Sequence, residues 1–453
     1  MPFVPHTTQD EQIMLDAIGA NSIEDLFDEI PADLRAGTLD KTPEAITEME
    51  LVRLMSDRAR QDEVGLSFLG AGAYHHHIPA AVWDLVSRGE FMTVYTPYQA
   101  EASQGTLQLI YEFQTMMTRL TGMDVANASV YDGASALAEA ILMAVRANRK
   151  SKSRAVLLAG NLHPNYLSTV RNIVRNQNIE IVTLPYNVET GGIDMSALEE
   201  YREQDFAALA ISYPNFFGGL EDVHTLTDFA HLNGQLLIGV VNPMVLGVLG
   251  APGQWGEQGA DIVVGEGQPF GIPVASGGPY LGYMCCKQAI VRQMPGRIIG
   301  MTEDTDGKTG FALTLQAREQ HIRRGKATSN ICTNQGLLVT AATIYLSLMG
   351  DVGLSNVAAK CHQGLNQLLT AALKIEGVNA RFSKTVFHET VLELPKPASE
   401  VLAAMAEQGV IAGYDLGLVD PSLANCMLTN VTEVKTAADI ELFATLLSSA
   451  LEG

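Results

Sequence analysis

The sequence of 453 residues has no lysine between Lys152 and Lys287, so no residue of that long segment can form a Schiff base. Charge is also scarce, since Asp, Glu, Lys and Arg make up 18% of the chain and the formal net charge is −22. An acidic balance excludes the basic surface that nucleic-acid binding needs. No run of about 18 uncharged apolar residues is present, so we expect no membrane span.

Cysteines are few, and neither their number nor their spacing suggests a disulfide framework or a zinc site. The five are Cys285, Cys286, Cys332, Cys361 and Cys426. The N-terminus lacks the basic and apolar regions of a secretory signal. We therefore expect reduced thiols in a cytoplasmic protein. The 47% of hydrophobic residues is typical of a folded globular chain.

Residues 1–65 are predicted to form a helical extension. Ser22 and Asp25 resemble a capping box, and apolar residues follow at helical spacing before Pro31. A second helix is predicted over 42–60. Extensions of this kind pack across a subunit interface or over the main domain, and the pattern does not distinguish the two.

Residues 66–335 are predicted to form a large α/β domain with a mostly parallel sheet. Short apolar runs alternate with helix signals, which is typical of parallel strands joined by helical crossovers. The expected strands cover 155–159, 179–184, 206–212, 236–241 and 261–265. Asp306-Gly307 predicts a hairpin between 298–302 and 310–313.

Residues 336–453 are predicted to form a smaller α+β domain. It begins with an apolar helix over 336–348 and ends with an amphipathic helix that Thr436 and Asp439 cap. Between them we expect strands over 378–382, 390–394 and 426–431 and a helix over 399–408.

A glycine-rich loop follows the strand expected over 261–265 and contains Gln268. The pattern resembles the large domain of fold-type I pyridoxal-phosphate (PLP) enzymes, which present a lysine at this edge of the sheet to hold the cofactor. Gln268 stands where that lysine is expected, and an amide cannot form the imine. Asn242 stands where such enzymes place an aspartate against the pyridine nitrogen, and an amide cannot hold that nitrogen protonated as a carboxylate does.

A second loop, Tyr131-Asp-Gly-Ala-Ser135, precedes a helix expected to reach about Asn148. Backbone N–H groups and small residues at a helix N-terminus form an anion site, which PLP scaffolds use for the cofactor phosphate. A plain helix start with small packing residues has the same sequence pattern.

Three longer motifs carry a more specific resemblance. They are residues 68–74 (FLGAGAY), 95–105 (YTPYQAEASQG) and 323–335 (RRGKATSNICTNQ). Through them the whole chain resembles the glycine dehydrogenase (decarboxylating) family, the P-protein of the glycine cleavage system. It is similar to the N-terminal half of the long form, which some bacteria make as a separate subunit 1.

The resemblance implies a heteromeric enzyme in which a lysine-bearing subunit 2 holds the PLP, with an α2β2 heterotetramer expected. Glycine is decarboxylated there, and its aminomethyl group passes to the lipoylated H-protein. This chain is then expected to complete the partner's site without binding the cofactor covalently and to be inactive alone.

Residues that cross into the partner's site are expected on two of the motifs. The expected interface contributors are Tyr95, Tyr98, Gln99, Gln104, Arg323 and Arg324. Hydroxyl and amide donors of Thr328, Ser329 and Asn330 are expected to reach the partner's PLP phosphate. A structural role in interface packing and satisfied polar loops remains the alternative for each of them.

Histidines offer a further candidate site, but we expect no metal. His75, His76 and His77 are adjacent, and consecutive side chains point in different directions, so they do not favour one ion. His163 follows the strand expected over 155–159 and lies near the expected pocket or satisfies a loop.

Two other functions remain open. The chain is a self-sufficient PLP enzyme if another lysine, such as Lys287 or Lys326, holds the cofactor. It is a non-catalytic scaffold if its only role is to stabilise its partner.

Overall fold

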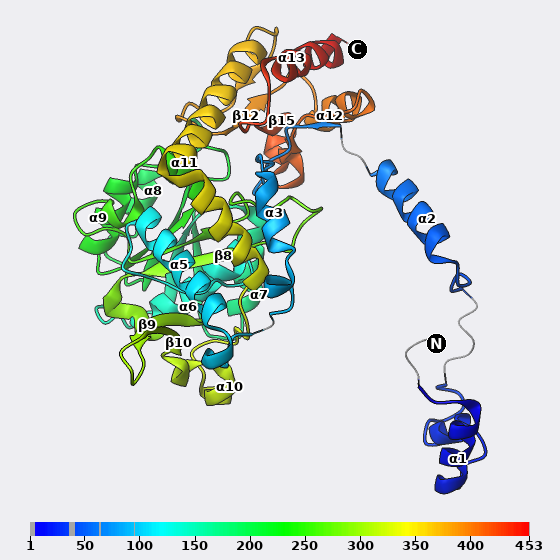
Figure 1. Cartoon of the computed structure of the whole chain (residues 1–453). Coiled ribbons are helices and arrows are strands. Elements are labelled where there is room, and N and C mark those ends of the chain that lie inside the picture. Colours follow the sequence, from blue (N-terminus) through cyan, green and yellow to red (C-terminus); the bar gives the residue numbers. More distant parts are fainter. Residues whose placement is uncertain (1–4, 36–40, 63–64, 95, 453) are drawn as a thin grey trace. The chain divides into compact units, whose positions relative to one another are not determined.

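The computed structural model describes residues 5–35, 41–62, 65–94 and 96–452. The chain divides into two compact units, Met1–Glu63 and Val64–Gly453 (Figure 1). The boundary lies close to the predicted end of the helical extension.

In the N-terminal unit, the described residues form capped helices without a buried core. The helices α1 (Thr8–Ile18) and α2 (Glu48–Gln61) each begin at a capping box. No residue of α1, α2 or the 3-10 helix η1 (Glu24–Phe27) is buried. The apolar side chains of this unit therefore remain exposed within it.

The predicted helices of this unit are partly wrong. Ser22 and Asp25 form the predicted reciprocal hydrogen bonds, but only the η1 turn follows. A short helix without a packing partner is marginal, because nucleation is costly. The helix expected over 42–60 begins at Glu48 instead, because Thr47 caps it there.

The second unit is built around a seven-stranded sheet in the order β2-β8-β7-β6-β5-β3-β4. The five strands β3 to β7 run parallel to one another. Strand β8 is antiparallel to both β7 and β2. The strands are β2 (Val125–Ala126), β3 (Ala155–Ala159), β4 (Glu180–Leu184), β5 (Ala208–Tyr213), β6 (Leu236–Val241), β7 (Ile262–Glu266) and β8 (Gly282–Cys286). The predicted parallel sheet is confirmed, with strand ends within two residues.

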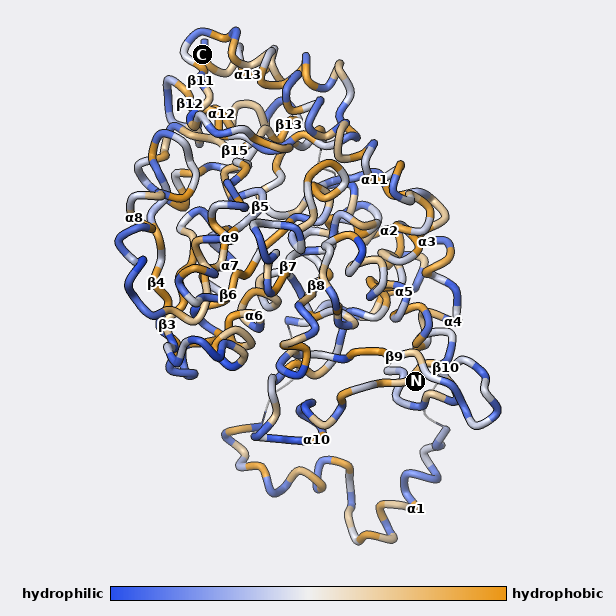
Figure 2. Tube along the Cα trace, turned by 90° about the vertical axis from the view of Figure 1, so that its left-hand side faces the viewer, coloured by the Kyte–Doolittle hydropathy of each residue, from blue (hydrophilic) through white to orange (hydrophobic). Residues whose placement is uncertain are grey.

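Helices connect these strands and complete the core. They are α5 (Gln104–Thr121), α6 (Gly133–Ala147), α7 (Pro164–Val174), α8 (Met195–Glu199) and α9 (Val223–Leu232). Helix α6 packs against β7, β8 and α7, and most of its residues are buried. In Figure 2 hydrophobic stretches run through β6 and α6, whereas the rim near α8 is hydrophilic. The extensive burial of β5, β6 and β7 fits a sheet covered on both faces.

The chain enters this unit next to its C-terminal part. Strand β1 (Leu66–Ser67) pairs in parallel with β13 (Val410–Ile411), and the ring of Phe68 packs 4.8 Å from that of Phe443. Local sequence patterns do not predict this long-range pairing. It anchors the segment that follows, residues 70–74, between the central sheet and the C-terminal sheet.

The predicted hairpin is confirmed. Strand β9 (Ile298–Glu303) pairs antiparallel with β10 (Thr309–Thr314), and Gly307 has the positive φ of 75° that the turn requires. Two 3-10 turns, η6 (Gln316–Arg318) and η7 (Arg324–Lys326), flank the short helix α10 (Gln320–Arg323) after it.

Helix α11 (Gly336–Ala372) is much longer than the predicted helix over 336–348. Gly350 interrupts its helical backbone at φ 59°. By length and composition alone α11 could cross a membrane. Its buried residues Tyr345 and Leu365 belong to two different hydrophobic clusters of the unit, which is how a core helix packs.

The C-terminal sheet has four antiparallel strands in the order β11-β12-β15-β14. They are β11 (Asn379–Ala380), β12 (Glu389–Glu393), β14 (Tyr414–Asp415) and β15 (Cys426–Asn430), with the helices α12 (Ala398–Glu407) and α13 (Ala437–Glu452). Thr436 and Asp439 cap α13 as predicted. The α+β pattern is thus confirmed, while a domain boundary at residue 336 stays a prediction.

Candidate functional site

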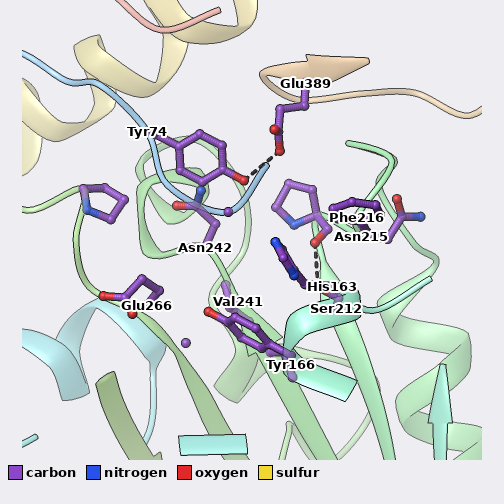
Figure 3. Close-up of a pocket in the computed structure, with 15 residues that line it drawn as sticks. Tyr74, His163, Tyr166, Ser212, Asn215, Phe216, Val241, Asn242, Glu266 and Glu389 are labelled. Atoms are coloured by element: carbon purple, nitrogen blue, oxygen red, sulfur yellow. Dashed lines mark hydrogen bonds between the residues drawn. The ribbon is translucent and has the colours of Figure 1, made fainter. Parts of the chain in front are cut away.

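A pocket lies at the carboxyl ends of β5, β6 and β7, where open parallel sheets bind their ligands. Its cavity volume is about 70 Å³, and it opens to solvent. Figure 3 shows Tyr74 and Glu389 on one side and Glu266 and Tyr166 on the other. The polar side chains that line it belong to Tyr74, His163, Tyr166, Ser212, Asn215, Asn242, Glu266 and Glu389.

Gln268 follows β7 and is 1% exposed. Its Oε1 accepts the N–H of Tyr74 at 2.9 Å, and its Nε2 donates to the Tyr74 carbonyl at 2.9 Å and the Ile272 carbonyl at 2.7 Å. The amide is therefore engaged on both its oxygen and its nitrogen. Among the described residues that line the pocket there is no lysine, and hence no amine that could hold PLP as a Schiff base.

The 70–74 loop closes one side of the pocket. Gly70, Ala71 and Gly72 all have positive φ values, of 56°, 55° and 101°. Glu389 holds the loop, because its carboxylate accepts the Ala71 N–H and the Tyr74 hydroxyl, each at 2.7 Å. Burial raises the pKa of Glu389 to about 7, although these hydrogen bonds lower it.

Glu266, the last residue of β7, lies next to the N-terminus of α6. Its carboxylate accepts three backbone N–H groups, from Gly133 at 3.0 Å, Gln268 at 3.0 Å and Leu281 at 2.8 Å. Burial raises the pKa of Glu266 to about 7, with a smaller contribution from Asp132, while the three hydrogen bonds lower it.

The loop 131–135 starts α6 as predicted, with Asp132 as its N-cap. The Asp132 carboxylate accepts the N–H of Ser135 at 2.7 Å. Because Glu266 accepts the N–H of Gly133, two carboxylates of this chain take up the first turn of the helix. Two N–H groups of the expected anion site are therefore already hydrogen-bonded within the chain.

His163 lines the pocket and is also satisfied by the loops around it, so both predicted alternatives apply. Its Nε2 lies 2.8 Å from the Ala71 carbonyl, and its Nδ1 accepts the N–H of Asn165 at 3.1 Å. These partners assign the proton to Nε2. Burial lowers the pKa of His163, so the ring is neutral at neutral pH.

Asn242 lies at the end of β6 and lines the same pocket. Its Oδ1 accepts the N–H of Met244 at 3.0 Å, and its Nδ2 lies 3.2 Å from Nε2 of His388. Burial lowers the pKa of His388 to about 3, so this ring is neutral and accepts the amide hydrogen bond. Asn242 thus serves a local hydrogen-bond network.

The predicted interface residues that the structure describes lie outside this pocket. Tyr95 lies outside the described residues. Gln104 exchanges two hydrogen bonds with the backbone of Phe311 on β10, at 2.8 and 2.9 Å, which favours the structural alternative for it. Tyr98 is 48% exposed and Gln99 is exposed.

The motif 323–335 also lies outside the pocket. Arg323 and Thr328 line a separate basic pocket with Arg292, Arg318 and Lys326. Arg324 and Asn330 are exposed, and the hydroxyl of Ser329 accepts the N–H of Ile331 at 3.0 Å.

One residue that the sequence reading missed organises both motifs. Arg297 is 3% exposed and donates to the hydroxyl of Tyr98 at 2.7 Å, with its guanidinium 5.1 Å from the ring centre. It also donates to Thr333, Asn334 and the Cys332 carbonyl at 2.9 to 3.1 Å. Arg297 therefore fixes Tyr98 against the loop 332–334.

Neither alternative lysine lines the pocket. Lys287 follows β8 and pairs with Asp261 at 2.7 Å, which lies at the amino end of β7 and thus at the opposite edge of the sheet. Lys326 lines the basic pocket.

The three adjacent histidines point in different directions, as expected: only His76 is buried. Its Nδ1 lies 2.7 Å from Glu433, whose other oxygen accepts the N–H of His77. Cys361 donates to the same carboxylate at 3.4 Å, so potential ligand atoms of three residues lie within 4.8 Å. The Glu433 carboxylate thus connects residues 76–77 to the segment just before α13.

A family model and two full-length relatives that resemble this chain indicate one family. The family model described as "Glycine cleavage system P-protein" matches residues 1–447. A probable glycine dehydrogenase (decarboxylating) subunit 1 from Alcanivorax borkumensis is 61% identical over 452 residues, covering 100% of both chains. A protein of the same name from Thioalkalivibrio sulfidiphilus is 59% identical over 451 residues, again over 100% of both chains.

Solved structures agree with the fold. The crystal structure of a glycine decarboxylase (P-protein) of the glycine cleavage system, in inhibitor-bound form, superposes with a TM-score of 0.88 at 38% identity and 100% coverage of both chains. A sphingosine-1-phosphate lyase from Burkholderia pseudomallei matches with a TM-score of 0.67 at 15% identity, over 93% of this chain and 95% of that one, which shows the fold alone. The predicted fold class, that of fold-type I PLP-dependent enzymes, is confirmed. The chain belongs to the family of the glycine cleavage system P-protein.

Proposed function

We propose that the chain is subunit 1 of a heteromeric glycine dehydrogenase (decarboxylating) and acts with a lysine-bearing subunit 2. The observation that supports this proposal is the buried, hydrogen-bonded amide of Gln268, which we take to stand at the position of the family's Schiff-base lysine. The names of the full-length relatives support the subunit assignment. The chain is then inactive alone.

PLP on the partner's lysine supplies the electron sink for the loss of CO2 from glycine. This chain's own contribution is to shape and enclose the partner's site from two exposed segments. Tyr98 and Gln99 form one, and Arg323, Arg324 and residues 328–330 form the other, in which Thr328 and Ser329 are half-buried and the rest are exposed. Their exposure and the rigid support of Tyr98 by Arg297 favour a contact across a subunit interface.

Within the second segment, Thr328, Ser329 and Asn330 donate to the phosphate of the partner's cofactor. Arg323 and Arg324 pair with a carboxylate or phosphate, because the guanidinium fork suits both. Gln104 and Tyr95 remain proposed interface residues. Gln104 contributes by supporting β10 through its hydrogen bond to Phe311.

The aminomethyl group formed from glycine passes to the lipoylated H-protein, and the complex is an α2β2 heterotetramer in the cytoplasm. The acidic net charge of −22 argues against nucleic acid as a partner and is compatible with these protein partners.

A second candidate is a scaffold that only stabilises its partner. The satisfied hydrogen bonds of Gln104 favour it, because they give this motif a purely structural role.

Reconstitution tests the proposal. The chain, subunit 2 and their mixture are assayed for exchange of bicarbonate into the carboxyl group of glycine, and we expect activity only in the mixture. Exchange by this chain alone would overturn the assignment. Full activity of a mixture carrying Tyr98→Ala and Arg323→Ala together would favour the scaffold.

A further inference from the structure

The first turn of α6 has the features of a phosphate site. The helix spans fifteen residues, Gly133–Ala147, and its N-terminus lies beside the pocket at the carboxyl edge of β7. Free N–H groups and the helix dipole make such an end attractive to anions. A cofactor phosphate in this fold would need those N–H groups.

Two carboxylates of the chain accept hydrogen bonds from N–H groups of this turn instead. Asp132 accepts the Ser135 N–H, and Glu266 accepts the Gly133 N–H together with two further backbone N–H groups. In either protonation state an oxygen of Glu266 fills the acceptor position at Gly133. A doubly charged phosphate would meet both acidic side chains there.

Packing is also tight around the Cα of Gly133. A side chain at position 133 would collide with the hydroxyl of Tyr166 and lie within 2.9 Å of the Glu266 nitrogen. On the other side of the pocket, the Ala71 carbonyl lies against His163, and Gln268 and Glu389 tie the 70–74 loop in place.

We infer that Glu266 is a built-in substitute for a cofactor phosphate, so that this chain excludes PLP even as a non-covalent ligand. The missing lysine is then one of two changes that close the site. Replacing Gln268 with lysine restores the amine but leaves the phosphate position occupied. The inference rests on the fold and not on the proposed partner.

The test compares three variants of the full chain: Gln268→Lys, Glu266→Ser with Gln268→Lys, and Glu266→Gln with Gln268→Lys. Each is incubated with PLP and reduced with borohydride, and the pyridoxyl group on residue 268 is counted by peptide mass spectrometry. We expect about one equivalent only with Glu266→Ser, because glutamine keeps the size and the acceptor oxygen. Uptake by Gln268→Lys alone, or none by a folded Glu266→Ser double variant, would overturn the inference.

A second measurement covers the case in which the double variants do not fold. Inorganic phosphate is titrated into the wild-type chain, Glu266→Ser and Glu266→Gln by calorimetry. Glu266→Ser should bind phosphate at least about tenfold more tightly than the other two, since only it frees the Gly133 N–H at the start of the helix. Saturable binding of PLP or phosphate at this pocket in the wild-type chain would contradict the inference directly. Glycine exchange activity plays no part in either readout, so a failure here is distinguishable from a failure of the proposed function.

Discussion

The side-chain amide of Gln268 pairs with the backbone of Tyr74 through two reciprocal hydrogen bonds of 2.9 Å each, as two residues of an antiparallel β-sheet do. A lysine could not provide this pairing, because it has donors and no acceptor. The amide of Gln268 therefore holds the 70–74 loop over the pocket.

Removing this amide should destabilise the chain. In Gln268→Ala the Tyr74 N–H, the Tyr74 carbonyl and the Ile272 carbonyl lose their partners inside the protein, and we expect a loss of about 3 kcal/mol in the free energy of unfolding. Urea unfolding measures it. Gln363→Ala, at an exposed position of α11, is the control and should change stability by less than about 0.5 kcal/mol. Equal stabilities of the two variants would show that the amide does not hold the loop.

Stability should fall as the pH rises through neutrality. Burial raises the pKa of Glu389 to about 7, so the stability linked to this carboxyl is complete below its unfolded pKa and is lost as the pH rises through about 7. We expect a loss of about 2 kcal/mol between pH 5 and pH 8 from Glu389, and a similar loss from Glu266.

Glu389→Gln isolates the first carboxyl, because glutamine keeps an acceptor for Ala71 and does not ionise. Thermal unfolding at several pH values should show a flatter profile for Glu389→Gln than for the wild type. Glu393→Gln, at an exposed position of the same strand, should keep the wild-type profile. Parallel profiles for all three proteins would contradict the prediction.

The opposite dependence is expected for Glu433 at acidic pH. Burial would raise its pKa, but the hydrogen bonds from His76 and the His77 N–H outweigh burial and lower the pKa of Glu433 to about 2. Its stabilisation is therefore present above the unfolded pKa and is lost as the pH falls towards 2, by about 2 kcal/mol between pH 6 and pH 3. Urea unfolding of the wild type and Glu433→Gln should converge over this range. A constant difference between them would rule out the titration of Glu433 as the cause.

Arg297 should act as a positioning residue for the proposed interface. In Arg297→Lys one ammonium cannot reach Tyr98, Thr333, Asn334 and the Cys332 carbonyl together, so both motifs lose their fixed geometry. We expect the exchange rate of the reconstituted complex to fall about tenfold or more, with its PLP content unchanged. Arg202→Ala, which removes an exposed pair with Glu199, should keep the full rate. A loss of PLP that parallels the loss of rate would indicate general disruption instead.

The repeating parts of the fold were predictable because their signals are local. The apolar runs that became β3 to β7, the Asp306-Gly307 turn and the Thr436 cap each depend on residues close in sequence. In the N-terminal unit local signals were insufficient, since no core packs on η1 and α2 begins at its own cap.

Much of the candidate site was not predictable in this way. Gln268 and Asn242 follow recognisable strands, but Glu389 reaches the pocket from a strand about 120 residues further along, and Arg297 joins Tyr98 to residues 332–334 across the fold. Glu266 carried a signal that was available: an acidic residue two positions before Gln268, at the end of a buried strand, needs a set of donors.

The proposed subunit completes a PLP enzyme without holding PLP itself. The most direct test is to reduce the active complex with borohydride and to map the pyridoxyl-lysine by peptide mass spectrometry. We expect the label on a lysine of the partner subunit and none on any peptide of this chain, including those with Lys287 and Lys326. A pyridoxyl group on any lysine of this chain would contradict it.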